Sequence, residues 1–199
     1  MTKDVNKIVT TLTERAYGKH TFKAAKLMRE SLLLGGLLTN IEGWINVTKQ
    51  DLDDLEKPDT ILLRKLFPSS GNASRAFMQL ELGVIPVKFV VMQKRMNFLH
   101  YILNEDINSM IRQVFDALRE DSRKGDFISL TNKDKTDLKI DKTDEEIAEM
   151  TKVTWKKYVK EMVKSAALES LVQENNTKEK TRDIQFETLK ISEYLEKKM

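Results

Sequence analysis

Apolar residues recur at intervals of three and four along almost the whole sequence, and few residues interrupt them. The 199 residues include 7 Gly and 3 Pro, whereas these two residue types together average about 12% of protein sequences. Intervals of three and four are typical of amphipathic helices, and a turn-dense β-sandwich or barrel needs many more breakers. We therefore predict an all-α fold.

The helical pattern is strongest between residues 86 and 103. Apolar residues there follow one another in steps of three, four, three and four: Phe89, Met92, Met96, Leu99 and Leu103. Pro86 suits the first turn of such a helix, because proline has no N–H to donate. A segment this apolar needs cover on more than one side. We predict an irregular helical bundle around a central apolar helix at about residues 86–103.

The remaining pattern divides into shorter segments. Helices are expected at 5–17, 22–34, 110–118 and 153–171, with a weaker segment at 127–140 and a capping box at 143–146. Gly35-Gly36 is expected to break a helix, and residues 37–45 are expected to form a short core helix that includes Trp44. Pro58 is expected to end or kink the helix that follows Thr48. Residues 184–195 fit a strand or a helix, and we predict a helix. A boundary at Lys124-Gly125 gives a region 1–124 and a helical extension 125–199.

Charge and composition exclude several classes of protein. No Cys is present, which excludes disulfides, Cys-ligated zinc and a cysteine nucleophile. The net charge is +3, with 15 basic and 10 acidic residues in 1–104 against 19 and 21 in 105–199. No apolar run approaches 18 residues and the first residues lack the form of a signal peptide. We expect a soluble intracellular protein, cytoplasmic or nuclear, that does not enter a membrane.

No catalytic, metal or cofactor site is predicted. The acidic run Asp51–Glu56 lies at the expected start of a helix, where carboxylates oppose the helix dipole. His20 and His100 are the only histidines and no third ligand stands at a recognisable spacing; His100 is expected to pack at the core edge with one nitrogen satisfied. The glycines fit neither phosphate-binding fingerprint.

Two sets of basic residues are candidate nucleic-acid contacts. Lys156, Lys160 and Lys164 repeat every four residues, with Lys157 alongside, so they share one helix face that either binds phosphates or is simply solvated. The second set is Arg64, Lys65, Lys88 and Arg95. Lys88 and Arg95 lie seven residues apart at the border of the apolar helix, where long cationic side chains either extend to water or reach a phosphate.

Several stretches, in the order in which they occur, resemble the region that follows the polymerase core in reverse transcriptases of LINE-type (non-LTR) retrotransposons. They are residues 29–34, 37–44, 48–56, 62–66, 80–86, 95–103 and 124–127, and the similarity is loose after them. Pro58 departs from the family, whose helix usually continues at this point. The family's Tyr/Phe-x-Asp-Asp motif lies before this region, and Asp53-Asp54 does not match it because Asp51 stands where the aromatic residue belongs.

The resemblance implies a non-catalytic, thumb-like helical region that helps to hold template and primer. We therefore expect a retroelement-derived fragment, not an enzyme, that binds RNA or an RNA–DNA hybrid weakly and electrostatically. The alternative is a helical protein-interaction module that docks on a separate polymerase chain or on itself.

Overall fold

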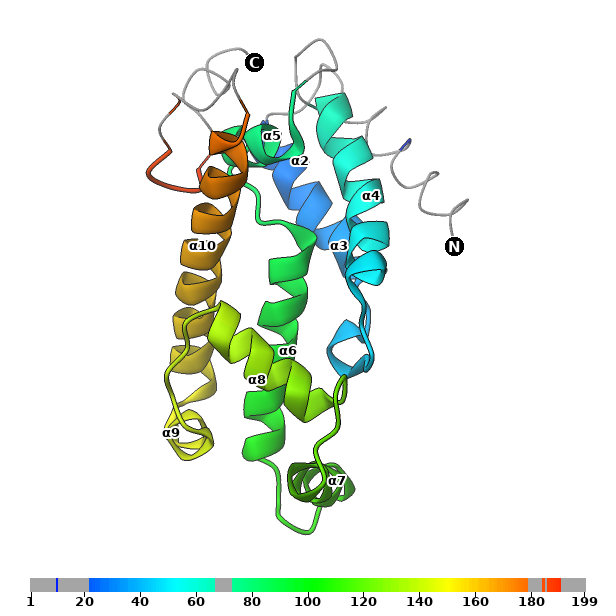
Figure 1. Ribbon diagram of the computed structural model, residues 1–199, viewed down its shortest axis with the longest axis vertical. Coiled ribbons are helices and arrows are strands. Elements are labelled where there is room, and N and C mark those ends of the chain that lie inside the picture. The colour runs from blue at the N-terminus through cyan, green and yellow to red at the C-terminus, as the bar shows by residue number, and fades with distance from the viewer. Residues whose placement is uncertain (1–9, 11–21, 67–72, 179–183, 185, 191–199) are drawn as a thin grey trace. The chain divides into compact units, whose positions relative to one another are not determined.

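A computed structural model describes residues 10, 22–66, 73–178, 184 and 186–190, and these residues form helices joined by turns and loops without a β-strand. The predicted all-α class is confirmed. The elements in chain order are α2 (Phe22–Met28), a π-helix η1 (Arg29–Leu33), α3 (Leu34–Leu37), a 3-10 helix η2 (Ile41–Gly43), α4 (Lys49–Leu66), α5 (Arg75–Glu81), α6 (Val87–Leu103), α7 (Met110–Glu120), α8 (Phe127–Asp137), α9 (Asp144–Glu149) and α10 (Lys152–Asn176) (Figure 1).

The chain divides into two compact units that alternate along the sequence. Unit 1 contains residues 1–39, 49–87 and 167–199, and unit 2 contains residues 40–48 and 88–166. This division differs from the boundary at residues 124 and 125 that the sequence suggested. Each unit therefore consists of segments that are separated in the sequence, and contacts between distant parts of the chain hold it together.

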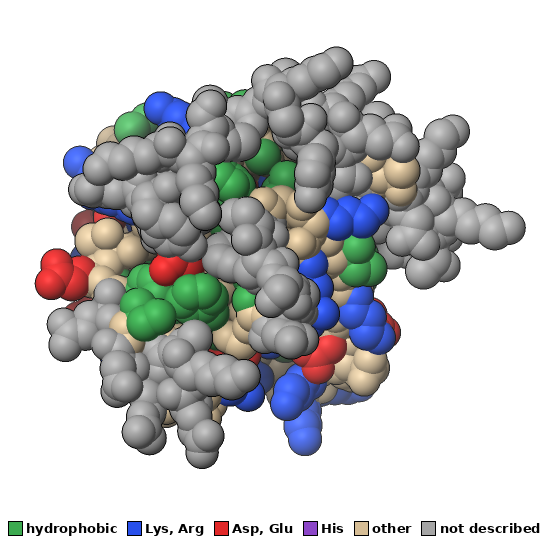
Figure 2. Space-filling model, turned by 90° about the horizontal axis from the view of Figure 1, so that it is seen from above, with side chains coloured by type: hydrophobic (Ala, Val, Ile, Leu, Met, Phe, Trp, Pro, Cys, Tyr) green, Lys and Arg blue, Asp and Glu red, His purple; other side chains and the backbone are tan. Residues whose placement is uncertain are grey.

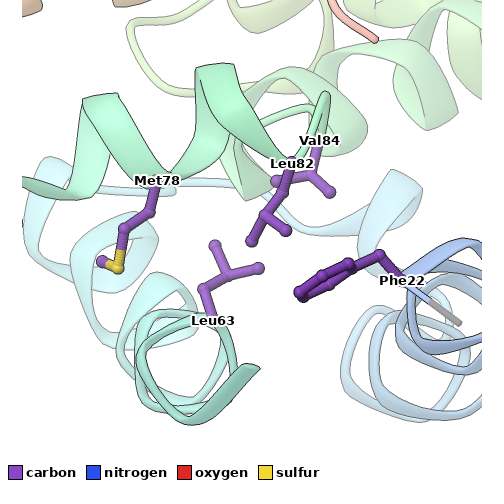
Figure 3. Close-up of a cluster of buried hydrophobic side chains, with 5 residues drawn as sticks. All are labelled: Phe22, Leu63, Met78, Leu82 and Val84. Carbon is purple, nitrogen blue, oxygen red and sulfur yellow. The ribbon is translucent and has the colours of Figure 1, made fainter. Parts of the chain in front are cut away.

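The core of unit 1 joins residues from α2, α4, α5 and the loop after α5. Figure 3 shows Leu63, Leu82 and Phe22 directed toward a common space, and Met78 and Val84 complete the cluster. A second cluster pairs Leu33 with Leu62, and a third joins Ala76 and Leu80 to Leu171. Burial of these side chains stabilises unit 1, since each fully buried large apolar side chain contributes about 1.5–3 kcal/mol.

Buried polar side chains connect the elements of unit 1. Arg29, the first residue of the π-helix, donates to both carboxylate oxygens of Asp59 at 2.5 and 2.6 Å and to the carbonyl oxygen of Ile85 at 2.9 Å. Glu56 accepts from Gln79 at 2.7 Å and from the backbone N–H of Val87, the first residue of α6, at 2.9 Å. Burial, with a smaller contribution from Asp59, raises the pKa of Glu56. The polar residues of α4 thus fix the segments before and after it.

The expected break at Gly35-Gly36 does not occur, and α4 does not end at Pro58. α4 runs from residue 49 to 66 with Pro58 inside it, and the helical segment from 22 to 37 passes through Gly35-Gly36. A proline in a helix interior costs about 3 kcal/mol relative to alanine and a glycine about 1 kcal/mol. Burial of Leu55, Leu62 and Leu63 offsets the first cost, and burial of Leu33 and Leu34 offsets the second.

The prediction of a core helix at residues 37–45 is wrong. Leu38 and Ile41 are buried, but η2 is a single turn, and Trp44 and Ile45 after it are exposed. α3 ends at Leu37, and Asn40, in a left-handed conformation with φ of 57°, directly precedes η2. A chain reversal therefore replaces the continuous helical face that the apolar run suggested.

Unit 2 is built on α6. The predicted helix begins at Val87, directly after Pro86, and it lies beside α8 and α10 (Figure 1), with hydrogen bonds to both. Phe98 packs edge-on against Phe127 of α8, and the Trp155 indole N–H of α10 donates to the Met96 carbonyl oxygen at 3.1 Å. Phe115 of α7 packs against Phe127 as well. The cover on more than one side that the sequence required for this helix is thus present within unit 2.

The ends of the other predicted helices are largely confirmed. α7 occupies residues 110–120, α8 residues 127–137 and α10 residues 152–176, and Thr143 with Glu146 forms the predicted capping box at the start of α9. Residues 184 and 186–190 are irregular, so the predicted helix is wrong there, and 191–195 lie outside the described residues. The expected helix at 5–17 lies outside them too, except Thr10, which is helical.

Candidate nucleic-acid interface

Each unit holds two of the four cations expected to form one groove. Arg64 and Lys65 are exposed in the last turn of α4 in unit 1, whereas Lys88 and Arg95 belong to α6 in unit 2. Lys88 is half-buried, with its ammonium 4.6 Å from the centre of the Phe89 ring. Figure 2 shows Lys and Arg side chains at several places on the drawn face, with acidic side chains beside some of them. Neither unit alone contains the predicted groove.

The expectation that Arg95 faces outward is wrong. Arg95 is only 3% exposed, and its Nη1 donates to the Asp134 carboxylate of α8 at 2.7 Å. Burial raises the pKa of Asp134 to about 6, although the Arg95 charge acts to lower it. The Nε atom of Arg95 is buried without a hydrogen-bond partner. The physical reason is that α8 covers the side of α6 on which Arg95 lies, so the guanidinium is an internal counterion and cannot contact a phosphate.

The lysines of α10 that were predicted to share one helix face lie at its surface. Lys156 and Lys160 are exposed, and Lys164 keeps 44% of its side-chain surface while pairing with Glu161 at 3.6 Å. Trp155, Val159 and Val163 are buried on the opposite side of the helix. Steps of four residues place successive cations about 6 Å apart along the axis. The amphipathic burial of α10 therefore holds these lysines in one row that faces solvent.

Two further lysines extend this cationic face. Lys157 is exposed beside Lys156, and Lys152, one helical step before Lys156, is exposed in the first turn of α10. Among the described residues neither has an ion-pair partner, nor do Lys156 and Lys160. We call Lys152, Lys156, Lys160 and Lys164 the lysine stripe. The same four-residue spacing that identified the other three would have identified Lys152.

A pocket of about 260 Å³ adjoins the first turns of the lysine stripe, entirely within unit 2. α10 contributes Lys152, Trp155 and Lys156 to its lining, and α6 contributes Asn97, His100 and Tyr101. The sequence did not predict this pocket, because α6 and α10 are about fifty residues apart and only the fold brings them together. Cationic, amide and aromatic side chains therefore converge on one concave site.

His100 and Trp155 form a rigid wall of this pocket. The two rings stack with centres 5.9 Å apart and planes 13° apart. The His100 Nε2 lies 2.8 Å from the Met150 carbonyl oxygen, to which it donates. His100 is buried with this nitrogen satisfied, as predicted from the sequence. Hydrogen bonds to backbone carbonyls therefore hold both rings in place.

The acidic run 51–56 forms the start of α4, as expected. Asp51, Asp53 and Asp54 are exposed, and hydrogen bonds from Lys57 and Gln50 lower the pKa of Asp54.

Within the described part of the chain, no three His, Asp or Glu side chains are grouped as the ligands of a metal ion would be. None of the helices in that part has the length and hydropathy needed to span a bilayer.

A separate apolar surface lies on α7 and the turn before it. Ile107 is 71% exposed and Met110 82%, and Val114 lies one helical turn after Met110 and is also exposed. A hollow of about 310 Å³ beside Val114 is lined by Ala117, Leu118 and charged residues. Large apolar side chains that gather on one exposed helix face are a feature of protein-binding surfaces.

Comparisons of the chain with models of known protein families, with curated protein sequences and with solved structures found no significant match.

Proposed function

We propose that this protein binds RNA or an RNA–DNA hybrid through the lysine stripe of α10, without reading sequence. The observation that carries the proposal is the row of cations held in register by one helix, three of which have no acidic partner among the described residues. Lysines that neutralise phosphates release counterions and give salt-dependent affinity. Arg64 and Lys65 are exposed in unit 1 and stay a separate candidate contact, whereas buried Arg95 is not one.

The proposed origin is the region after the polymerase core of a LINE-type reverse transcriptase, acting to hold template and primer without catalysing nucleotide addition. Its support is the series of similar stretches in the sequence together with the all-helical fold. Pro58 departs from the family pattern, yet α4 continues through it as the family's helix does. We expect no metal-dependent primer extension by the purified chain, and extension would overturn this part of the proposal.

The binding experiment measures the affinity for a labelled RNA–DNA hybrid by fluorescence anisotropy at several salt concentrations. Four stripe contacts predict that log K falls with log salt with a slope of about −2.8 to −3.6, taking about 0.7–0.9 per phosphate. Lys156→Ala with Lys160→Ala should flatten the slope by about 1.4–1.8. Lys124→Ala with Lys133→Ala, which removes two exposed lysines elsewhere in unit 2, is the matched control. Equal slopes for both double variants would overturn the proposal.

A second candidate function is binding to another copy of the chain through the α7 surface formed by Ile107, Met110 and Val114. Their exposure favours it, since like apolar faces can pair across a twofold axis. Light scattering should then give a defined dimer that Met110→Asp converts to a monomer. A monomer at all concentrations would refute this second candidate.

A further inference from the structure

We propose that the pocket between α6 and α10 accepts one unstacked nucleobase of a single strand whose phosphates lie on the lysine stripe. This inference rests on the proposed function, because the stripe supplies the backbone contacts. It adds what the stripe lacks, namely a contact that distinguishes a base-bearing strand from a bare polyanion. Single-stranded nucleic acids are commonly bound by this combination of a cationic groove with aromatic side chains.

The size and place of the pocket fit one base. Its volume of about 260 Å³ lies just below the roughly 300–1,000 Å³ of typical small-molecule sites, so it suits a single ring system rather than a larger ligand. Lys152 and Lys156 line the pocket and also begin the stripe. A strand that follows the stripe therefore passes the opening, and one of its bases can turn inward while the adjacent phosphates remain on the lysines.

The α6 side of the pocket has the chemistry to hold a base. Tyr101 is 50% exposed, and one face of its ring stacks on Phe98 with centres 6.0 Å apart and planes 14° apart. A ring held in this way loses little conformational entropy when a base stacks on its other face. The Oδ1 atom of Asn97 is buried without a hydrogen-bond partner, and Asn97 lines the pocket. This oxygen is closed to solvent in the structure, so the Asn97 side chain must turn toward the pocket before the N–H edge of a base supplies the donor that it lacks.

The charges of the pocket set the direction in which a nucleotide enters. Cations line only the α10 side, as Lys152 and Lys156, whereas Glu105 lies on the α6 side and accepts a hydrogen bond from the Tyr101 hydroxyl. This carboxylate repels a phosphate and leaves that side to the uncharged base. The buried faces of His100 and Trp155 close the pocket between the two sides.

The experiment compares a ten-nucleotide adenylate strand with an abasic ribose-phosphate strand of equal length and charge. The protein carries Trp44→Phe, so its remaining tryptophan, Trp155, reports on the pocket, and anisotropy gives the affinity. We expect the adenylate strand to bind about tenfold more tightly than the abasic strand and to change the Trp155 emission, because stacking one base has an effect of this size. Asn97→Leu should remove this difference and leave the salt slope unchanged, while Asn132→Leu, an exposed asparagine of α8, should preserve it.

The outcomes separate the two proposals. Equal, salt-dependent binding of both strands would overturn the base pocket and leave the stripe intact, whereas binding of neither would overturn both. Equally tight binding of a polyglutamate peptide would also overturn the base pocket, since it would show that only negative charge is recognised. If circular dichroism shows that Asn97→Leu does not fold, Tyr101→Leu provides the same test, because Tyr101 is half-exposed.

Discussion

Raising the pH from 4 to 7 should destabilise the fold through Asp134. Burial raises the pKa of this carboxyl from 3.8 to about 6 in the folded protein, and the unfolded chain restores the lower value. Between these two values the folded state holds more protons than the unfolded state, so the free energy of unfolding falls as the pH rises. About two pKa units, at 1.36 kcal/mol each, give a loss of about 3 kcal/mol, of which about 1 kcal/mol falls between pH 5 and 7.

The assay is urea unfolding followed by circular dichroism at pH 5 and 7 and constant ionic strength. Glu56, whose pKa is also raised by burial, changes stability in the same direction. The double variant Arg95→Met with Asp134→Leu isolates the contribution of Asp134. It should lose this part of the pH dependence while keeping or gaining stability at pH 7, because an apolar pair of similar volume often replaces a buried ion pair without loss. An unchanged difference between pH 5 and 7 in this variant would refute the reasoning.

Further predictions concern both units. The Arg95→Met and Asp134→Leu variant should keep the salt slope of nucleic-acid binding, as anisotropy will measure, because the pair is buried. Arg29→Met should lower the free energy of unfolding in urea by about 3–5 kcal/mol, since it leaves the buried Asp59 carboxylate unpaired; a loss below 1 kcal/mol would contradict this. Gly125→Ala should lower it by about 1–3 kcal/mol because Gly125 has φ of 88° and a Cβ would lie 2.3 Å from Asn46 Oδ1. Pro58→Ala should raise the thermal midpoint, which a lower midpoint would refute, by relieving up to about 3 kcal/mol of helix cost.

Local signals were sufficient to predict most helices. The i, i+3 and i, i+4 apolar positions of α6 and α7 and the capping box at Thr143 depend on residues within one or two turns, so the sequence contains all that they need. The lysine stripe belongs to the same category, because the spacing of Lys156, Lys160 and Lys164 and the apolar positions between them lie on a single helix. Exposure of the stripe followed from the burial of its opposite face.

Features that depend on distant partners were not predictable in this way. The residues near Arg95 in the sequence do not predict its pairing with Asp134, which is 39 residues later and on another helix. Pro58 predicted that α4 ends or kinks. Leu62 and Leu63 after it, however, are buried against residues of α2, η1 and α5 and of the loop after α5, which lie far from them in the sequence. The pocket combines Asn97 and Tyr101 with Lys152 and Lys156, which the sequence separates by about fifty residues. Each of these features exists only once helices have packed.

The contrast between Arg95 and the lysine stripe explains why a charged residue at the border of an apolar helix is an uncertain guide to binding. A phosphate contact releases counterions only if the cation is solvated and unpaired before the ligand arrives. A cation on a helix covered from two sides must find a carboxylate within the protein, since an unpaired buried charge is far more costly than a buried pair. α6 is covered by α8 and α10, so its Arg95 is paired with Asp134, whereas α10 leaves one side open and its lysines remain available. α6 therefore supplies Asn97 and Tyr101 to the candidate pocket, and α10, which covers α6, supplies its cations.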